Sequence, residues 1–244
     1  MSALQPIRIN ANPDIRQEQI SDTDFCVIVD DFLRDPQALI DYAAENPDKF
    51  REPGIAYPGL MMDLDPGLLR EFTRFVLTPM RHQFSFLRGS ASLATGLSMI
   101  TLQPGELSAY QRLCHTDPRD TLGRRKFASL VYLFENEDLG GTAFYRWKQP
   151  EVVVHGMTLA YQEAGSADKF LAEHSEVFRQ SPCFMTDSND LAELLHVVMP
   201  RFNRFVFYSG EIPHSACIKH PELITDDFRQ GRLTLNSFIS VYPR

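Results

Sequence analysis

The triplet His115-Thr116-Asp117, near the centre of the chain, carries two side chains that are suited to hold a metal ion. In an extended segment, His115 and Asp117 point to the same face because residues two apart share a face. An imidazole and a carboxylate are two of the three ligands of the 2-His-1-carboxylate triad, which suits iron(II) and leaves coordination positions open. The triplet alone is weak evidence for a metal site, because a surface loop with the sequence His-Thr-Asp-Pro is the simpler interpretation.

A second histidine on another strand would complete this site. His214 follows a β-rich run at 201–209 and a Ser-Gly turn, where a β core would place a residue at the mouth of a strand. His155 ends the apolar run EVVVH and is the rival candidate. Other histidines are expected in helices or a loop and are interpreted as solvated or structural: His174, His196 and His220.

Arg232 begins the run RLTLNSFIS, in which apolar and polar residues alternate as in a β-strand. An arginine that faces inward from a strand is costly unless it is paired with an anion. The guanidinium group is well shaped to bind a carboxylate through two hydrogen bonds. Thr234 shares the face of Arg232 and could donate a further hydrogen bond. The alternative is an exposed arginine on an edge strand.

The N-terminal part of the chain predicts a strand followed by two helices. Residues 25–32 (FCVIVDDF) form a short β-branched apolar run that is typical of a buried strand. Asp-Pro pairs at 35–36 and 65–66 then supply a helix cap and a proline at the first helical position. Apolar residues at helical spacing follow each pair, which predicts helices over 36–46 and from 66 to about 77.

From residue 93 the sequence favours a β architecture. Short runs rich in β-branched and aromatic residues, many of them separated by Gly or Pro turns, are typical of a sandwich or barrel. They lie at 93–103, 127–134, 141–147, 151–155, 201–209, 214–218 and 232–241. Residues 166–198 carry two helical patterns, the second starting at Asp187 or Ser188, and predict a helical insert. The expected fold class is mainly β with flanking helices (α+β), the N-terminal helices packing on the β core.

Length and composition restrict the number of domains and the partners that we expect for this chain. The chain has 244 residues, of which 43% are hydrophobic and 23% charged, and this suits a single domain over 1–244. In that domain, the N-terminal strand and helices of 1–92 would support a β core formed by 93–244. A net charge of −8 argues against a nucleic-acid partner. The four cysteines are widely spaced and are interpreted as reduced thiols. With no signal sequence and no span of about 20 apolar residues, we expect a cytoplasmic protein without membrane contact.

In this order, the motifs resemble the prolyl-4-hydroxylase-like branch of the iron(II)/2-oxoglutarate dioxygenases. The resemblance covers about residues 99–240 and is closest to uncharacterised bacterial members. It comprises MITLQPGELSAYQRLCHTD, SLVYLF, GGTAFY, NRFVFYSGEIPHSA and GRLTLNSF. It implies a double-stranded β-helix (jelly-roll, cupin-like) core and a hydroxylase that releases succinate and carbon dioxide. It also implies iron(II), 2-oxoglutarate as co-substrate and ascorbate as a candidate reductant.

Carried over residue by residue, the resemblance makes His115, Asp117 and His214 the catalytic iron ligands. Arg232 would pair with the distal carboxylate of 2-oxoglutarate, Tyr132 would hydrogen-bond the same group, and Thr234 is a weaker addition. Arg232 lies 18 residues after His214, a longer gap than in the animal prolyl hydroxylases. Gln103 stands where many relatives have a tyrosine before Pro-Gly, and the insert has no counterpart. A coordinating Asp117 favours hydroxylation over halogenation, because halogenases leave that position open for chloride.

The substrate is less defined than the metal site. A peptide, an amino acid or another small molecule fits the resemblance, and the oligomeric state is open, a homodimer included. A basic run after the triplet could meet an acidic substrate, although such runs are more often solvated loops; its members are Arg119, Arg124, Arg125 and Lys126. Two other functions stay open: a non-catalytic β-barrel regulatory protein that binds metal and oxoacid, and a zinc hydrolase on the same ligands.

Overall fold

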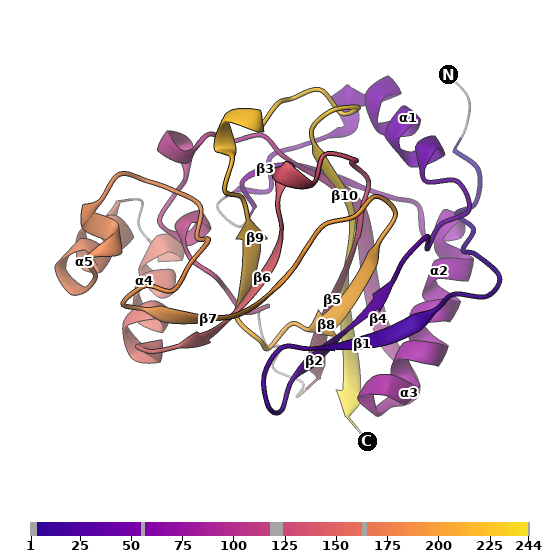
Figure 1. Cartoon of the computed structure of the whole chain (residues 1–244), viewed down its shortest axis with the longest axis horizontal. Helices are drawn as coiled ribbons and strands as arrows, with labels where there is room; N and C mark the ends of the chain where they lie inside the picture. Colours follow the sequence, from indigo (N-terminus) through magenta and orange to yellow (C-terminus); the bar gives the residue numbers. More distant parts are fainter. Residues whose placement is uncertain (1–3, 55–56, 118–123, 163–164, 244) are drawn as a thin grey trace.

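Two antiparallel sheets form the centre of the computed structural model, which describes residues 4–54, 57–117, 124–162 and 165–243 (Figure 1). The larger sheet has the strand order β1-β2-β8-β5-β10-β4-β3 and the smaller sheet the order β7-β6-β9. The strands of the larger sheet are β1 (Ile15–Gln19), β2 (Phe25–Val29), β3 (Gly59–Asp63), β4 (Phe86–Ile100), β5 (Arg125–Tyr132), β8 (Phe205–Ser209) and β10 (Arg232–Pro243). The smaller sheet contains β6 (Gly141–Trp147), β7 (Ala192–Val198) and β9 (His214–Cys217).

Alternation along β10 separates the two faces of the larger sheet. Leu233 and Leu235 point outward into a core shared with the N-terminal helices, whereas Arg232 and Thr234 point toward the smaller sheet. The helices that cover the outer face are α1 (Gln37–Glu45), α2 (Arg70–Phe75) and α3 (Arg81–Phe84). In Figure 1 they lie to the right of the sheets. The expected packing of N-terminal helices on the β core is therefore confirmed.

The inner faces of the two sheets pack on each other. Leu130, Val206 and Tyr208 of the larger sheet share one apolar cluster with Phe144 and Val198 of the smaller sheet. This arrangement is the predicted α+β fold with a double-stranded β-helix core. The expected Asp-Pro helix starts are also present: Asp35 Oδ1 accepts a hydrogen bond from the backbone N–H of Ala38 (3.1 Å), and Asp65 Oδ1 accepts one from Gly67 (2.6 Å).

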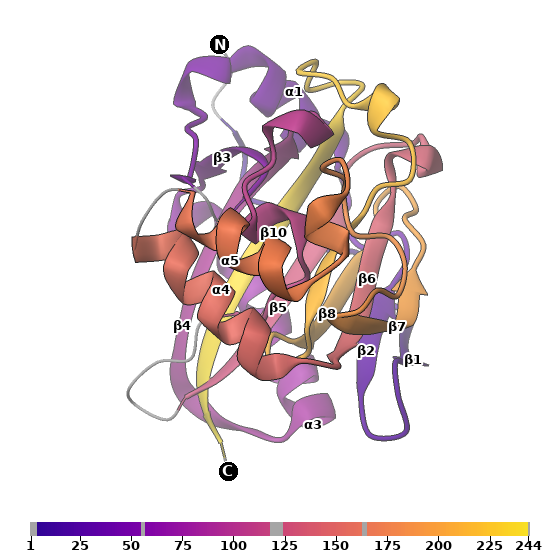
Figure 2. The same cartoon turned by 90° about the vertical axis from the view of Figure 1, so that its left-hand side faces the viewer.

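The connection between β6 and β7 differs from the prediction. Residues 151–155, predicted as a strand, lie in α4 (Pro150–Gln162), which is followed by α5 (Ser166–His174). The valine run buries Val153 against α5, and Gly156 allows the two helices to approach, because a Cβ there would lie 2.6 Å from Leu171 Cδ2. In Figure 2 both helices face the viewer. Tertiary packing has thus overridden the β preference of valine.

The end of the predicted helical insert at 166–198 was also wrong. Residues 192–198 form strand β7, so the helical excursion ends at the short 3-10 helix Val177–Arg179. The side chain of Asn189 accepts hydrogen bonds from the backbone N–H groups of Leu191 and Ala192 (2.9 Å each). The predicted helix cap at Asp187 or Ser188 therefore lies in a turn that leads into a strand, where Ser188 Oγ accepts from the N–H of Leu194 at 2.9 Å.

No helix among the described residues is long and apolar enough to cross a membrane.

Candidate metal centre and its cavity

The His115-Thr116-Asp117 segment is fixed to the β9 side of the core by backbone hydrogen bonds. His115 and His214 exchange two such bonds, with N–O distances of 3.0 and 2.9 Å. The backbone N–H of Asp117 donates to the carbonyl of Gly210 at 2.8 Å. Residues 99 and 93 positions apart in the sequence (214 − 115 and 210 − 117) thereby become direct neighbours. His115 and Asp117 both face His214, as the spacing of two predicts.

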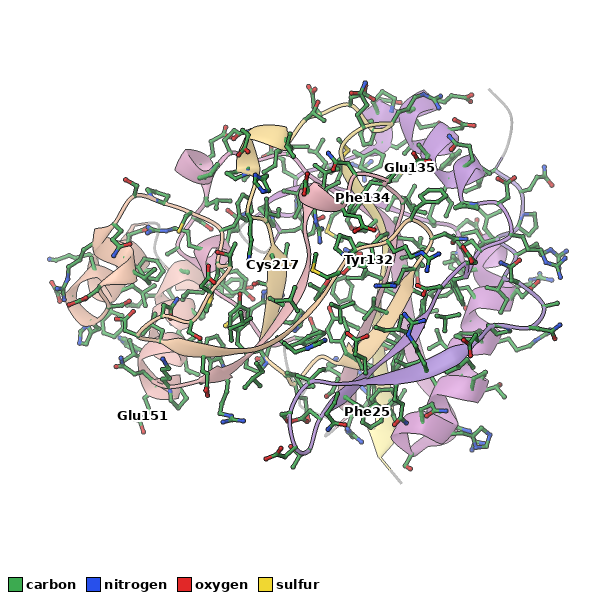
Figure 3. All side chains as sticks on the ribbon, viewed as in Figure 1. Phe25, Tyr132, Phe134, Glu135, Glu151 and Cys217 are labelled. Atoms are coloured by element: carbon green, nitrogen blue, oxygen red, sulfur yellow. The ribbon has the colours of Figure 1, made fainter. Side chains whose placement is uncertain are left out.

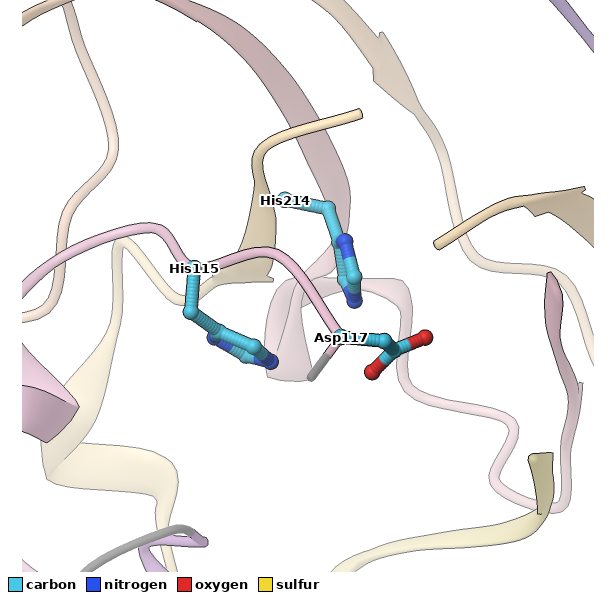
Figure 4. Close-up of side chains that lie close together, drawn as sticks. All are labelled: His115, Asp117 and His214. Carbon is cyan, nitrogen blue, oxygen red and sulfur yellow. The ribbon is translucent and has the colours of Figure 1, made fainter. Parts of the chain in front are cut away.

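Three possible ligand atoms, one from each of His115, Asp117 and His214, lie within 4.8 Å of one another. Figure 4 shows the three side chains pointing toward a common space. His214 Nδ1 donates to the carbonyl of Ile212 at 2.8 Å. Because a carbonyl only accepts, the proton must lie on Nδ1, and Nε2 is left as the ligating nitrogen. Within the described part of the chain, no second group of three or more His, Cys, Asp and Glu side chains has this geometry.

Electrostatics also fit a cation at this position. Burial, and then the neighbouring His214, lower the pKa of His115 to about 3, so its imidazole is neutral and able to ligate at neutral pH. Burial raises the pKa of Asp117, although His214 and Lys126 oppose the shift. Asp117 Oδ2 is buried without a hydrogen-bond partner among the described residues. A buried carboxylate oxygen without a partner is costly, and a divalent cation would remove that cost.

The absence of a side chain at Gly210 makes room for the Asp117 carboxylate. A Cβ at this position would lie 2.1 Å from Asp117 Oδ2 and 2.9 Å from its Cβ. Any larger residue would therefore displace the carboxylate from its position beside the two imidazoles.

Gly210→Ala is accordingly expected to weaken Mn(II) or iron(II) binding at least about tenfold, within the 10- to 100-fold range that disturbance of a metal ligand's surroundings typically causes. Isothermal titration of metal into the metal-free protein measures this effect. Gly105→Ala is the matched control, because a Cβ there meets nothing within 4 Å. Equal metal affinity in the two variants would contradict this role of Gly210.

The other histidines considered from the sequence do not join this group. The rival candidate His155 lies on α4, with its ring centroid 4.6 Å from that of Phe170. His174 bonds the carbonyl of Phe170 within α5. His196 pairs with Glu18 at 2.6 Å, and His220 pairs with Glu222 at 3.0 Å.

A cavity of about 450 Å³ extends from the three possible ligands along the inner faces of β5 and β10. His115, Asp117 and His214 line one part of it, and Arg232 and Thr234 line another. The site residues expected from the sequence thus share one space, apart from Tyr132, which is not in the cavity wall.

Arg232 is buried, with 4% of its surface exposed, and is fixed by the Gly140-Gly141 turn. Its Nε donates to the carbonyl of Gly140 (3.1 Å) and its Nη2 to that of Gly141 (2.9 Å). Gly140 has φ +88°, and a Cβ there would lie 2.1 Å from the carbonyl oxygen of Cys217, so this turn requires glycine. Among the described residues no carboxylate forms a salt bridge with Arg232, which leaves Nη1 available to an anion in the cavity.

Thr234 lies in the cavity wall, whereas Tyr132 lies behind it. Thr234 lines the cavity and donates its hydroxyl to the carbonyl of Ser98 at 3.3 Å. The Tyr132 hydroxyl is hydrogen-bonded to that of Thr142 at 2.8 Å, and Thr142, not Tyr132, forms the cavity wall. Figure 3 shows Tyr132 in the interior between the sheets, whereas Glu151 points away from the molecule.

A family model described as a family of unknown function, DUF6445, matches residues 11–239. The chain belongs to this family. No curated protein matches this DUF6445 member by sequence.

Several solved structures resemble the DUF6445 member in general fold. A prolyl-4-hydroxylase from Pseudomonas putida is 13% identical with a TM-score of 0.40, over 86% of each chain. The viral collagen prolyl hydroxylase of Paramecium bursaria Chlorella virus-1, solved as a 2OG complex, is 12% identical with a TM-score of 0.44, over 91% of this chain and 98% of its own. HygX from Streptomyces hygroscopicus, solved with iron bound, is 11% identical with a TM-score of 0.43, over 91% and 83%. Such distant likenesses assign no role to any residue.

The cavity of this DUF6445 member also contains residues that the sequence did not indicate. The helical connection and the segment after it contribute Tyr161, Phe184 and Met185, and the loop before β3 contributes Tyr57. These residues lie outside every motif, and only the packing of the chain brings them to the cavity.

The basic run after the triplet is divided among different surroundings. Lys126 lines the cavity and donates to Ser240 Oγ at 2.6 Å. Arg125 lies over the ring of Phe127, 5.0 Å from its centroid. Arg119 is outside the described residues.

Proposed function

We propose that this protein is an iron(II)- and 2-oxoglutarate-dependent oxygenase that hydroxylates a C–H bond of a small molecule or peptide. The observation that supports this most is the convergence of two imidazole nitrogens and one carboxylate in a cavity that also contains a buried guanidinium, which has no carboxylate partner among the described residues. A metal site alone fits many functions. A metal site that shares its cavity with an unpaired, buried cation fits a ligand that chelates at one end and is anionic at the other.

The residues fit iron(II) on three counts. The donor set is nitrogen, nitrogen and oxygen, which is the facial triad of non-haem iron(II) oxygenases. Asp117 Oδ2 lacks a hydrogen-bond partner in the described part of the chain, and Gly210 makes room for it. In the proposed function His115, Asp117 and His214 hold the metal. The bound iron would supply the site where oxygen is activated at the expense of 2-oxoglutarate, which is converted to succinate and carbon dioxide.

Arg232 and Thr234 would hold the distal carboxylate of the oxoacid in this proposal. Arg232 is suited to this role because two of its nitrogens are already fixed by the Gly140 and Gly141 carbonyls, so little side-chain freedom is lost when the ligand binds. Its burial strengthens attraction to an anion, since the surrounding dielectric constant is lower than that of water.

Asp117 favours hydroxylation over halogenation. A halide would need a coordination position, and in the proposed site the Asp117 carboxylate takes that position beside the two imidazoles. The substrate would enter beside residues of the helical connection, because Tyr161 lies at the cavity and contacts Tyr110 edge-on, with ring centroids 5.3 Å apart. Tyr110 in turn lies 5.9 Å from the His115 ring. The connection would therefore contribute to the choice of substrate.

Turnover without added substrate tests the proposed chemistry. Many oxygenases of this kind convert 2-oxoglutarate slowly on their own, so purified protein with iron(II), ascorbate, 2-oxoglutarate and air is expected to form succinate in a metal-dependent reaction. Replacement of iron(II) by Zn(II) should abolish it. Metal and oxoacid binding without any succinate, even with panels of amino acids and peptides, would instead support a non-catalytic binding protein.

A further inference from the structure

Tyr57 lines the cavity with a polar atom that has no partner. Its hydroxyl oxygen is buried and has no partner with hydrogen-bond geometry among the described residues, and the Thr234 side chain is the one neighbouring hydroxyl that influences it. A buried hydroxyl in this state costs roughly 1–3 kcal/mol. Such atoms are rare in folded proteins and require an explanation, of which a ligand is one.

The sheet register places Tyr57 near Arg232. Gly59 of β3 pairs with Ile100 of β4, and Ile100 pairs with Arg232 of β10. The three residues therefore lie in one row across three adjacent strands, which are about 4.8 Å apart. Tyr57 stands two residues before Gly59, and its ring reaches the cavity that Arg232 also lines.

The backbone of Tyr57 is held by the segment that leads to the metal site. Its carbonyl accepts a hydrogen bond from Gln111 Nε2 at 2.9 Å and another from the N–H of Gly59 at 2.9 Å. Gln111 Oε1 accepts from the N–H of Ser108, also at 2.9 Å. Gln111 lies four residues before His115, so the position of the phenol is linked to the segment that carries two of the proposed iron ligands.

The phenol is a hydrogen-bond donor at physiological pH. Burial raises the pKa of Tyr57 to about 12, although the positive charge of Arg232 and, to a smaller extent, the Thr234 side chain oppose the shift. A protonated phenol beside a guanidinium can donate only to an acceptor, and an anion satisfies both groups together.

We propose that Tyr57 and Arg232 together bind the distal carboxylate of the oxoacid co-substrate, and that Tyr132 is a positioning residue behind Thr142. This inference rests on the proposed function. It replaces the assignment of Tyr132 to the carboxylate. The Tyr132 hydroxyl is bonded to Thr142 and lies outside the cavity wall, whereas the Tyr57 hydroxyl lies in the cavity and has no partner with hydrogen-bond geometry among the described residues.

The test compares two oxoacids in the full-length protein loaded with Mn(II), which prevents turnover. 2-Oxoglutarate and 2-oxobutyrate share the chelating end, but only the first has a distal carboxylate. Isothermal titration gives the Kd of each for the wild type, Tyr57→Phe, Tyr132→Phe and Tyr42→Phe. Tyr42 is the matched control, because it lies on α1, outside the cavity, and its hydroxyl accepts a hydrogen bond from Lys49 in the 3-10 helix that follows.

Tyr57→Phe is expected to raise the Kd for 2-oxoglutarate about tenfold or more, the loss typical of one hydrogen bond to a charged group. The Kd for 2-oxobutyrate should stay within about twofold, because that ligand does not reach the phenol. Tyr132→Phe should have a smaller effect than Tyr57→Phe, and Tyr42→Phe none.

An unchanged Kd for 2-oxoglutarate in Tyr57→Phe, equal weakening of both oxoacids, or a larger effect in Tyr132→Phe would each overturn the inference while leaving the proposed function in place. Failure of the wild-type protein to bind 2-oxoglutarate would overturn both. Thermal unfolding of the metal-free variants separates loss of binding from loss of folding.

Discussion

Asp117→Ala is expected to lower the affinity for iron(II) by at least about a hundredfold and to abolish metal-dependent succinate formation. Loss of a residue that only supports a metal ligand typically costs 10- to 100-fold in affinity or activity, so loss of a ligand should cost at least as much. The three possible ligand atoms lie within 4.8 Å of one another, and the described residues offer no other carboxylate to this group. Calorimetric titration of Mn(II), together with succinate quantification under iron(II), measures both effects.

The fold itself should tolerate this substitution. Asp117 Oδ2 makes no hydrogen bond to any described residue, and burial raises the pKa of the carboxyl, so its removal deletes a costly buried group. The metal-free variant is expected to unfold at a temperature no lower than that of the metal-free wild type. Added Mn(II) should raise the unfolding temperature of the wild type but not that of Asp117→Ala, because only a bound ligand stabilises the native state.

Asp226→Ala is the matched control, since Asp226 is exposed in a loop. Full turnover by Asp117→Ala would refute the proposed ligand set. A variant that fails to fold would identify a structural role for Asp117 in its place.

Arg232→Ala is expected to raise the Kd for 2-oxoglutarate about a hundredfold, since removing one partner of a buried, hydrogen-bonded charge pair costs 2–5 kcal/mol. Metal affinity should be nearly unchanged, because Arg232 lies in a different part of the cavity from the proposed ligands. The apparent requirement for 2-oxoglutarate in succinate formation should rise in parallel. Calorimetry on the Mn(II)-loaded protein gives the Kd, and steady-state assays give the requirement.

The side chain of Arg232 also donates to the carbonyls of Gly140 and Gly141. Displacement of this turn would therefore account for part of the affinity for 2-oxoglutarate that Arg232→Ala loses. Arg232→Lys keeps the charge and is expected to bind 2-oxoglutarate more tightly than Arg232→Ala does, although less tightly than the wild type. Arg229→Ala is the control, because Arg229 is exposed and pairs with Asp41. If Arg232→Ala kept its affinity for 2-oxoglutarate, the carboxylate would have to be held elsewhere in the cavity.

The sequence allowed prediction of the features that depend on local periodicity. The spacing of two in His115-Thr116-Asp117 and the alternation after Arg232 both correspond to the faces that the structure shows. Each feature needs only the geometry of an extended chain, in which neighbouring side chains alternate. The Asp-Pro helix starts were predicted for a similar reason, because a cap and a fixed φ act within one turn.

Features that depend on tertiary packing were missed. The valines of α4 have β preference but form a helix because the helix buries Val153 against α5. The sequence predicted a helix cap at Asp187 or Ser188, whereas the side chains of Ser188 and Asn189 hold the turn that leads into β7. Nothing near Tyr57 in the sequence marks it as a cavity residue, because its position follows from two successive strand pairings and not from a motif.

Anaerobic addition of iron(II) and then 2-oxoglutarate to the metal-free protein tests the central claim most directly. A chelate of the oxoacid on iron(II), held by His115, Asp117 and His214, is expected to produce a visible charge-transfer band that titrates to one equivalent. The band should be absent in Asp117→Ala and should require more 2-oxoglutarate in Arg232→Ala. A folded wild-type protein that binds iron(II) but gives no such band at saturating 2-oxoglutarate would contradict the account.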